Sequence, residues 1–210
     1  MNLVDVSLRE LLASFASSDP TPGGGSASAA ASAIGASLLM MVSGLPKTRN
    51  GTEADKAMLA WTLIALTGIQ AQLTDAVDAD TAAYEQVVAA YRHPKGTDLE
   101  KAVRKTAIQR ALHAATDVPL NVMRLSAEAL QHARAVAAHG HRPAASDVGV
   151  GTALLAAGLH GAMLNVEINL DAIGDEAYKD AVAKEVDRLT AAGRASADAV
   201  RASLDGTPLQ

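Results

Sequence analysis

One uncharged stretch decides the fold of this chain: Ser26-Ala27-Ser28-Ala29-Ala30-Ala31-Ser32-Ala33-Ile34-Gly35-Ala36-Ser37-Leu38-Leu39-Met40-Met41-Val42-Ser43. It is long enough to raise the question of a membrane span. Its repeated serines and many small side chains instead favour a helix buried inside a helical bundle, apolar on every side. We therefore expect this helix to be the centre of a soluble domain, with no membrane segment.

Helical patterns flank this stretch in both directions, and no segment alternates with the period of two typical of a strand. Thr97 and Glu100 form a capping-box pattern, and Pro119 interrupts a long helical pattern. The predicted fold is all-α: an antiparallel bundle of about six helices, several of them long, one kinked by proline, in a single domain over residues 1–210. The expected helices span residues 5–15, 26–43, 52–91, 97–139, 146–171 and 175–204.

Composition narrows the function classes. Aromatic residues make up only 2% of the chain, so alanine, leucine, valine and glycine must fill the core. Such small side chains let helices approach closely, which favours a homodimer. The net charge of -5 with no basic patch argues against nucleic-acid binding. With no cysteine and no signal-peptide pattern at the N-terminus, we expect a cytoplasmic protein.

A proline–glycine turn precedes the uncharged helix, as Pro22-Gly23-Gly24-Gly25-Ser26. Glycines directly before a helix leave backbone N–H groups free at its positive end, which favours an anion. The turn is not a phosphate-binding P-loop, because no Lys-Ser/Thr pair follows at the required spacing. The alternative is a tight bend in which Ser26 caps the helix. The residues alone favour neither interpretation.

This turn, opening a Ser/Ala-rich helix, resembles the cyclodeaminase domain of formiminotransferase-cyclodeaminase, a family that includes stand-alone methenyltetrahydrofolate cyclohydrolases. The likeness runs over about residues 5–175, and its further motifs follow in order at residues 77–84, 107–120, 146–149 and 165–170. One departure is the segment Gly140 to Ala145, where the family often carries an Asn-rich run. Any ligand contact made by those asparagines is in doubt here.

The resemblance implies an enzyme of folate one-carbon metabolism with no cofactor beyond its tetrahydrofolate substrate. We expect a cyclohydrolase that opens the N5–N10 methenyl bridge with water to give 10-formyltetrahydrofolate. The absence of a fused formiminotransferase domain favours that reaction over cyclodeamination of 5-formiminotetrahydrofolate, which releases ammonia. A non-catalytic helical module that binds folate or another anion is a second alternative. The methenyl carbon is already electrophilic, so the reaction needs a carboxylate and hydrogen bonders rather than a metal.

Asp80 is the first candidate for that carboxylate, because aspartate is a poor helix former and here lies in mid-helix. The alternative is that Asp80 is a solvent-exposed residue with no catalytic role. Asp147 is the second candidate, and the alternative is that it only complements the dipole at the start of a helix. Asp147 and Asn165 lie five turns apart, or roughly 27 Å along one helix, so one subunit cannot bring both to one head group. Asn169 shares a helix face with Asn165, so the pair is expected either to act together on a ligand or to form hydrogen bonds between helices.

The resemblance further assigns a set of residues to substrate binding, and no residue to a metal. Histidines 132, 139 and 141 lie in or near a polar loop without a completing carboxylate or cysteine, so we expect no metal site there. The predicted substrate-binding residues are Pro22, Gly23, Gly24, Gly25, Ser26, Ser146, Asn165 and Asn169.

Overall fold

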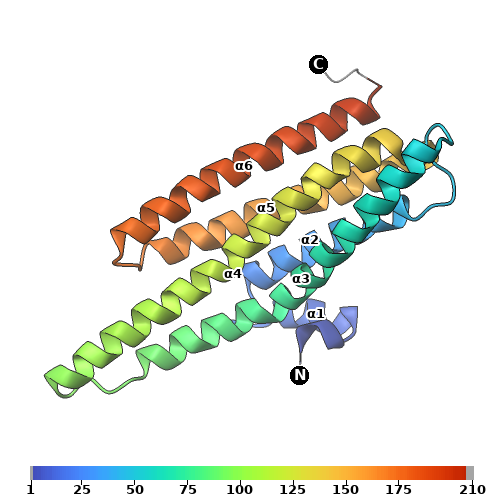
Figure 1. Cartoon of the computed structure of the whole chain (residues 1–210). Helices are drawn as coiled ribbons and strands as arrows, with labels where there is room; N and C mark the ends of the chain where they lie inside the picture. The colour runs from blue at the N-terminus through green and yellow to red at the C-terminus, as the bar shows by residue number, and fades with distance from the viewer. Residues whose placement is uncertain (1, 207–210) are drawn as a thin grey trace.

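A computed structural model describes residues 2–206 of the chain, and this part contains six α-helices and no strand (Figure 1). This confirms the predicted all-α bundle. Two short 3-10 turns, η1 (Leu3–Asp5) and η2 (Arg142–Ala144), accompany the helices. The helices are α1 (Leu8–Phe15), α2 (Gly24–Ser43), α3 (Glu53–Tyr91), α4 (Asp98–His139), α5 (Ala145–Leu170) and α6 (Glu176–Leu204).

The helix ends follow local capping chemistry. Ser7 and Glu10 form a capping box at α1, and Thr97 and Glu100 form the predicted one at α4. Thr52 and Asp175 cap α3 and α6 through their side chains. Helix α5 begins at Ala145, one residue before the predicted start at Ser146, and its N-cap residue Ala144 makes no side-chain hydrogen bond.

The five long helices form two layers. In one layer α4 packs between α3 and α6, and in the other α2 packs against α5. The main core lies between the layers and draws on all five helices, with Leu39, Leu66, Leu130 and Leu155 fully buried. α3 and α4 extend past the remaining helices as a hairpin (Figure 1), held by a second small core that includes Ile108, Leu112 and Ile173.

Glycines allow α2 and α5 to approach closely. A Cβ atom on Gly158 would lie 2.6 Å from the Ser28 carbonyl oxygen, and one on Gly35 would lie 2.6 Å from the Gly151 carbonyl oxygen. These contacts show that the two helices run antiparallel. The C-terminal part of α5 therefore lies beside the start of α2, and the start of α5 lies beside the end of α2.

The helices α2, α3 and the segment Arg142–Leu170 are each long and apolar enough to cross a membrane, judged by length and composition. Just over half of the most apolar 18-residue stretch of α2 is buried within the chain, and the buried share of the corresponding stretch is lower in α3 and in Arg142–Leu170. Part of the apolar surface of these helices is therefore exposed in the single chain.

Candidate active site

The start of α2 and the middle of α3 meet at Asp80. The Ser26 backbone N–H and the Ser26 hydroxyl both donate to Asp80 Oδ2, at 2.9 Å and 3.1 Å. Ser26 is fully buried and its hydroxyl also lies 3.4 Å from Thr81 Oγ1. One carboxylate oxygen is thus fixed by two hydrogen bonds at the positive end of a helix.

The other oxygen of Asp80 lies over a glycine. A Cβ on Gly25 would be 2.0 Å from Asp80 Oδ1, so only glycine leaves room for the carboxylate at this distance. Among the described residues, Oδ1 accepts no hydrogen bond. Asp80 therefore has one anchored oxygen and one oxygen left for a ligand or a water molecule.

Burial raises the pKa of Asp80 above its ordinary value of 3.8, and the two hydrogen bonds from Ser26 oppose that rise. A half-buried carboxylate with a raised pKa, held in a fixed position, is suited to accept and return a proton.

The interpretation of the glycine turn in which Ser26 caps the helix is wrong. Gly23 is the N-cap of α2 and the helix begins at Gly24, so Ser26 occupies the third helical position and is not the cap. The anion at this helix start is the protein's own Asp80 carboxylate, brought from 54 residues away. The Gly24 and Gly25 N–H groups have no acceptor in the part of the chain that the structure describes. They remain free to donate to a substrate.

Asn165 joins this site from α5. Its side-chain amide nitrogen would lie 3.3 Å from a Cβ on Gly24 and donates to the Gly161 carbonyl oxygen at 2.8 Å. Pro22, at a cis peptide bond after Thr21, leads into the same helix start. The structure thus brings together Gly24, Gly25, Ser26, Asp80 and Asn165, with Pro22 and Gly23 beside them.

Asn169 lies one turn further along α5 and has a different contact. Its amide nitrogen donates at 2.9 Å to the Ala115 carbonyl oxygen on α4. In a regular helix that oxygen would accept from residue 119, but Pro119 has no N–H. Asn169 therefore satisfies the carbonyl that Pro119 leaves unpaired, and α4 continues through the proline. A substrate contact by Asn169 stays a prediction.

This pairing predicts a thermodynamic coupling. We expect Asn169→Ala to lower the free energy of unfolding by about 1–3 kcal/mol, because the Ala115 carbonyl loses its donor. In a Pro119→Ala background residue 119 regains its N–H, so the same Asn169→Ala change should cost clearly less. Urea unfolding of the four proteins in this double-mutant cycle measures the coupling. Strictly additive costs would contradict it.

Ser146 and Asp147 lie at the opposite end of α5 from Asn165. Ser146 is exposed and Asp147 is half-buried. Within one subunit they do not reach Asp80, in agreement with the spacing of the sequence. Residues 2–206 hold no group of three or more His, Asp or Glu side chains arranged for a metal ion.

Sequence reasoning missed Thr81, which contacts Ser26, and the glycines of α5 that bring this helix against α2. The glycine spacing at 151, 158 and 161 was a usable signal, because small residues near one face of a helix permit close packing.

The sequence profile described as "Formiminotransferase-cyclodeaminase" matches residues 7–188. The chain is 39% identical to a methenyltetrahydrofolate cyclohydrolase from Methylorubrum extorquens, over 88% of each chain. It is 30% identical to the formimidoyltransferase-cyclodeaminase of Rattus norvegicus, matching 97% of this chain and 38% of that protein. The crystal structure of a formiminotetrahydrofolate cyclodeaminase from Thermotoga maritima superimposes with a TM-score of 0.85 at 27% identity, covering 96% of this chain and 97% of the other.

Proposed function

The chain belongs to the formiminotransferase-cyclodeaminase family, and from that membership we propose that it is an enzyme that opens 5,10-methenyltetrahydrofolate with water. The proposal is carried by the Asp80 carboxylate, which is anchored through one oxygen at the start of α2 with its other oxygen free. The 39% identical relative named a methenyltetrahydrofolate cyclohydrolase favours this reaction.

The chemistry needs one proton acceptor beside the bridge carbon. As water adds to the methenyl carbon, Asp80 Oδ1 takes its proton, and a neutral tetrahedral carbon forms between N5 and N10. The protonated Asp80 then gives its proton to N5 as the N5–carbon bond breaks. The remaining hydroxyl loses its proton to solvent, which leaves a formyl group on N10. The cation and water thus become neutral 10-formyltetrahydrofolate and one proton.

The free N–H groups of Gly24 and Gly25 and the amide of Asn165 support binding of the pterin. They place donors and an acceptor near Asp80, where the edge of a pterin ring presents both kinds of group. The raised pKa of Asp80 suits proton return to N5 in the second step.

Cyclodeamination of 5-formiminotetrahydrofolate is the alternative, favoured by the structural similarity to the Thermotoga maritima enzyme. N10 would attack the formimino carbon, and ammonia would leave from the same tetrahedral carbon. Two assays separate the reactions: loss of the near-ultraviolet absorbance of methenyltetrahydrofolate, and ammonia release from 5-formiminotetrahydrofolate. Acceleration of the first alone supports the cyclohydrolase. Acceleration of the second alone supports the cyclodeaminase, and no acceleration of either rejects both.

We also propose that the enzyme is a cytoplasmic homodimer rather than a membrane protein, with the outer face of α2 and α5 as the interface. Ile34 and Met41 on α2 are 52% and 43% exposed, and Val150 and Leu164 on α5 are 53% and 51% exposed. The seven-residue spacing 34–41 and 150–157–164 places these side chains in one stripe on each helix. A second copy of the same stripe would cover them.

A two-fold axis beside Ala157 would set residue 147 of each subunit opposite residue 167 of the other. The partner subunit's Asp147 would then lie close to Asn165 and the Asp80 site. The arrangement resolves the separation of about 27 Å between Asp147 and Asn165 along α5. It also keeps Asp147 as a second candidate carboxylate and Ser146 as a candidate binding residue, each contributed by the other subunit.

The interface predicts a specific effect of charge. Ile34→Glu should weaken the dimer by about a hundredfold or more, because it buries a charge in an apolar contact and repeats it by symmetry. Ile64→Glu is the matched control, since Ile64 is 75% exposed on α3, away from this face. Light scattering after size exclusion, over a dilution series, reports the change. A monomeric wild type, or equal dissociation of both variants, would contradict the interface.

A further inference from the structure

The α3–α4 hairpin has an aromatic strip that starts at the candidate active site. Tyr84 and Tyr91 follow Asp80 by four and eleven residues, which places all three on one face of α3. Because α2 begins beside Asp80, no part of α2 covers this face further along α3. Tyr84 is 41% exposed and Tyr91 is 49% exposed, in a chain with only five aromatic residues.

A cation is fixed at the far end of this strip. The Arg104 guanidinium lies 5.5 Å from the centre of the Tyr91 ring. Its Nε and one Nη donate to the Tyr91 carbonyl oxygen at 3.2 Å and 3.1 Å. Of its five N–H groups, two are used in this way and three remain.

No acidic side chain neutralises Arg104 in the described residues. The ion pairs within residues 2–206 involve other cationic side chains: Lys56, Lys101, Arg124, His139, Lys179, Arg188, Arg194 and Arg201. The Arg104 guanidinium is therefore half-buried and fixed in position by Tyr91, and it keeps three N–H donors without an acceptor in the described residues. A fixed guanidinium with free donors binds a carboxylate well.

The strip has the order and length of the tail of a reduced folate. That tail continues from the reacting nitrogens as an aminobenzoyl ring and then a glutamate with two carboxylates. At 1.5 Å per residue, Tyr84 lies about 6 Å and Tyr91 about 16 Å along α3 from Asp80. We propose that Tyr84 contacts the aminobenzoyl ring and that Arg104, on Tyr91, binds a glutamate carboxylate. The inference rests on the proposed function, because the pterin must lie at Asp80.

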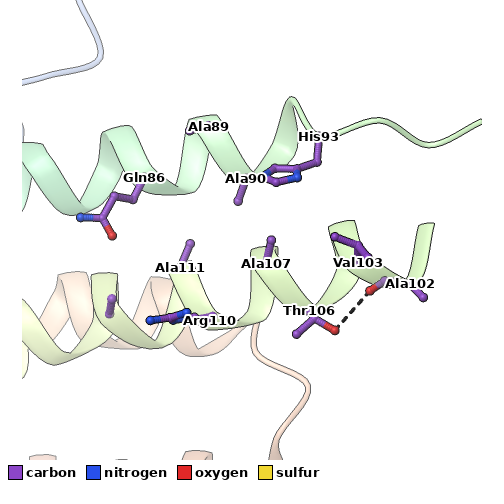
Figure 2. A pocket seen from close by; sticks show the side chains of 11 residues that line it. Gln86, Ala89, Ala90, His93, Ala102, Val103, Thr106, Ala107, Arg110 and Ala111 are labelled. Atoms are coloured by element: carbon purple, nitrogen blue, oxygen red, sulfur yellow. Dashed lines mark hydrogen bonds between the residues drawn. The ribbon is translucent and has the colours of Figure 1, made fainter. Parts of the chain in front are cut away.

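A second groove on the hairpin is the competing location. This cavity of about 790 Å³ lies between α3 and α4 and is lined mainly by alanines, with Gln86, His93 and Arg110 at its sides (Figure 2). Gln86 and His93 follow Asp80 by six and thirteen residues, which turns them roughly 120–140° away from it around α3. A folate tail that leaves Asp80 along the helix would therefore reach Tyr91 and not this groove.

The test compares Arg104→Met with Arg110→Met, two exchanges of arginine on opposite sides of the same hairpin. With methenyltetrahydrofolate, we expect Arg104→Met to raise KM by about tenfold or more at unchanged kcat, because a charge-assisted bond is lost. With methenyltetrahydropteroate, which lacks the glutamate, the wild type and Arg104→Met should have equal KM values. Arg110→Met should match the wild type with both substrates. A general structural effect of Arg104→Met would instead appear with both substrates.

A binding measurement separates this inference from the proposed reaction. Titration with p-aminobenzoylglutamate, followed by ligand-detected NMR, needs no turnover. Binding to the wild type and to Arg110→Met, with at least tenfold weaker binding to Arg104→Met, supports the tail site even in a protein that proves inactive on both folates. Equal binding to all three proteins, or binding lost only in Arg110→Met, overturns it.

Discussion

Asp80→Asn should lower the turnover of methenyltetrahydrofolate by about a hundredfold or more, because an amide cannot accept the proton of the attacking water. The amide oxygen can still accept both hydrogen bonds from Ser26, so the start of α2 should keep its structure. Initial rates at saturating substrate, read from the decay of the methenyl absorbance, measure the effect. Full activity of the variant would end the proposed role of Asp80.

The same exchange should not reduce stability. Burial raises the pKa of Asp80, so the folded protein disfavours its ionised form relative to the unfolded chain. That cost is present at neutral pH and disappears as the pH falls below the ordinary carboxyl pKa, where Asp80 is protonated in both states. Asp80→Asn removes the cost, so its Tm at pH 7 should equal or exceed that of the wild type. Asp75→Asn, at an exposed position on α3, is the matched control and should leave the rate unchanged.

The activity of the wild type should also depend on the pKa of Asp80. The proton acceptor is the ionised carboxylate, so kcat/KM should fall as the pH drops through the pKa of Asp80. Because that pKa is raised, the fall should begin above the pH at which an ordinary aspartate is protonated. Measurements on the acid side should extrapolate to a pKa higher than 3.8.

Gly25→Ala should reduce turnover nearly as much as Asp80→Asn, through geometry and not through chemistry. The new methyl group would lie 2.0 Å from Asp80 Oδ1 and 2.7 Å from Oδ2, so the carboxylate must move. Any movement that relieves the contact weakens the hydrogen bonds from Ser26 and displaces the free oxygen from the bridge carbon. A displacement of about 1 Å in a catalytic group typically costs about a hundredfold in rate.

The control for that variant is another helical glycine. A Cβ on Gly68, within α3, meets nothing within 4 Å. Gly68→Ala should leave the rate unchanged and raise the free energy of unfolding by about 0.5–1 kcal/mol, because alanine is the better helix former. Equal rates in Gly25→Ala and the wild type would show that the contact with Asp80 does not control catalysis.

Local sequence features predicted the fold well. Helix starts at Thr97 and Asp175 agree with the structure, since capping and periodicity act over a few residues. The charge-free helix α2 forms as predicted but is not buried on every side, because Ile34 and Met41 are 52% and 43% exposed. The predicted start of α2 was two residues late, because serine is a preferred N-cap residue but the helix begins within the glycine run, with Gly23 as its N-cap. The partner of this helix start is not local. Asp80 reaches Ser26 across 54 positions, and nothing in the glycine turn itself indicates which side chain will meet it.

The candidate site was predicted in part for the same reason. Asp80 and the glycine turn were both singled out, and the structure joins them. Asn169 was grouped with Asn165 by helical spacing, with hydrogen bonding between helices as the alternative to ligand binding, and it bonds to the Ala115 carbonyl on α4 that Pro119 leaves unpaired. Asp147 was separated from Asn165 by helix length alone, and the structure keeps them at opposite ends of α5.

The most direct test of the central role of Asp80 is a crystal structure of the protein with bound tetrahydrofolate. The pterin should lie at the start of α2, with N5 near Asp80 Oδ1 and with the Gly24 and Gly25 N–H groups donating to the ligand. A pterin bound away from Asp80, for example in the alanine-lined groove beside Arg110, would contradict the account.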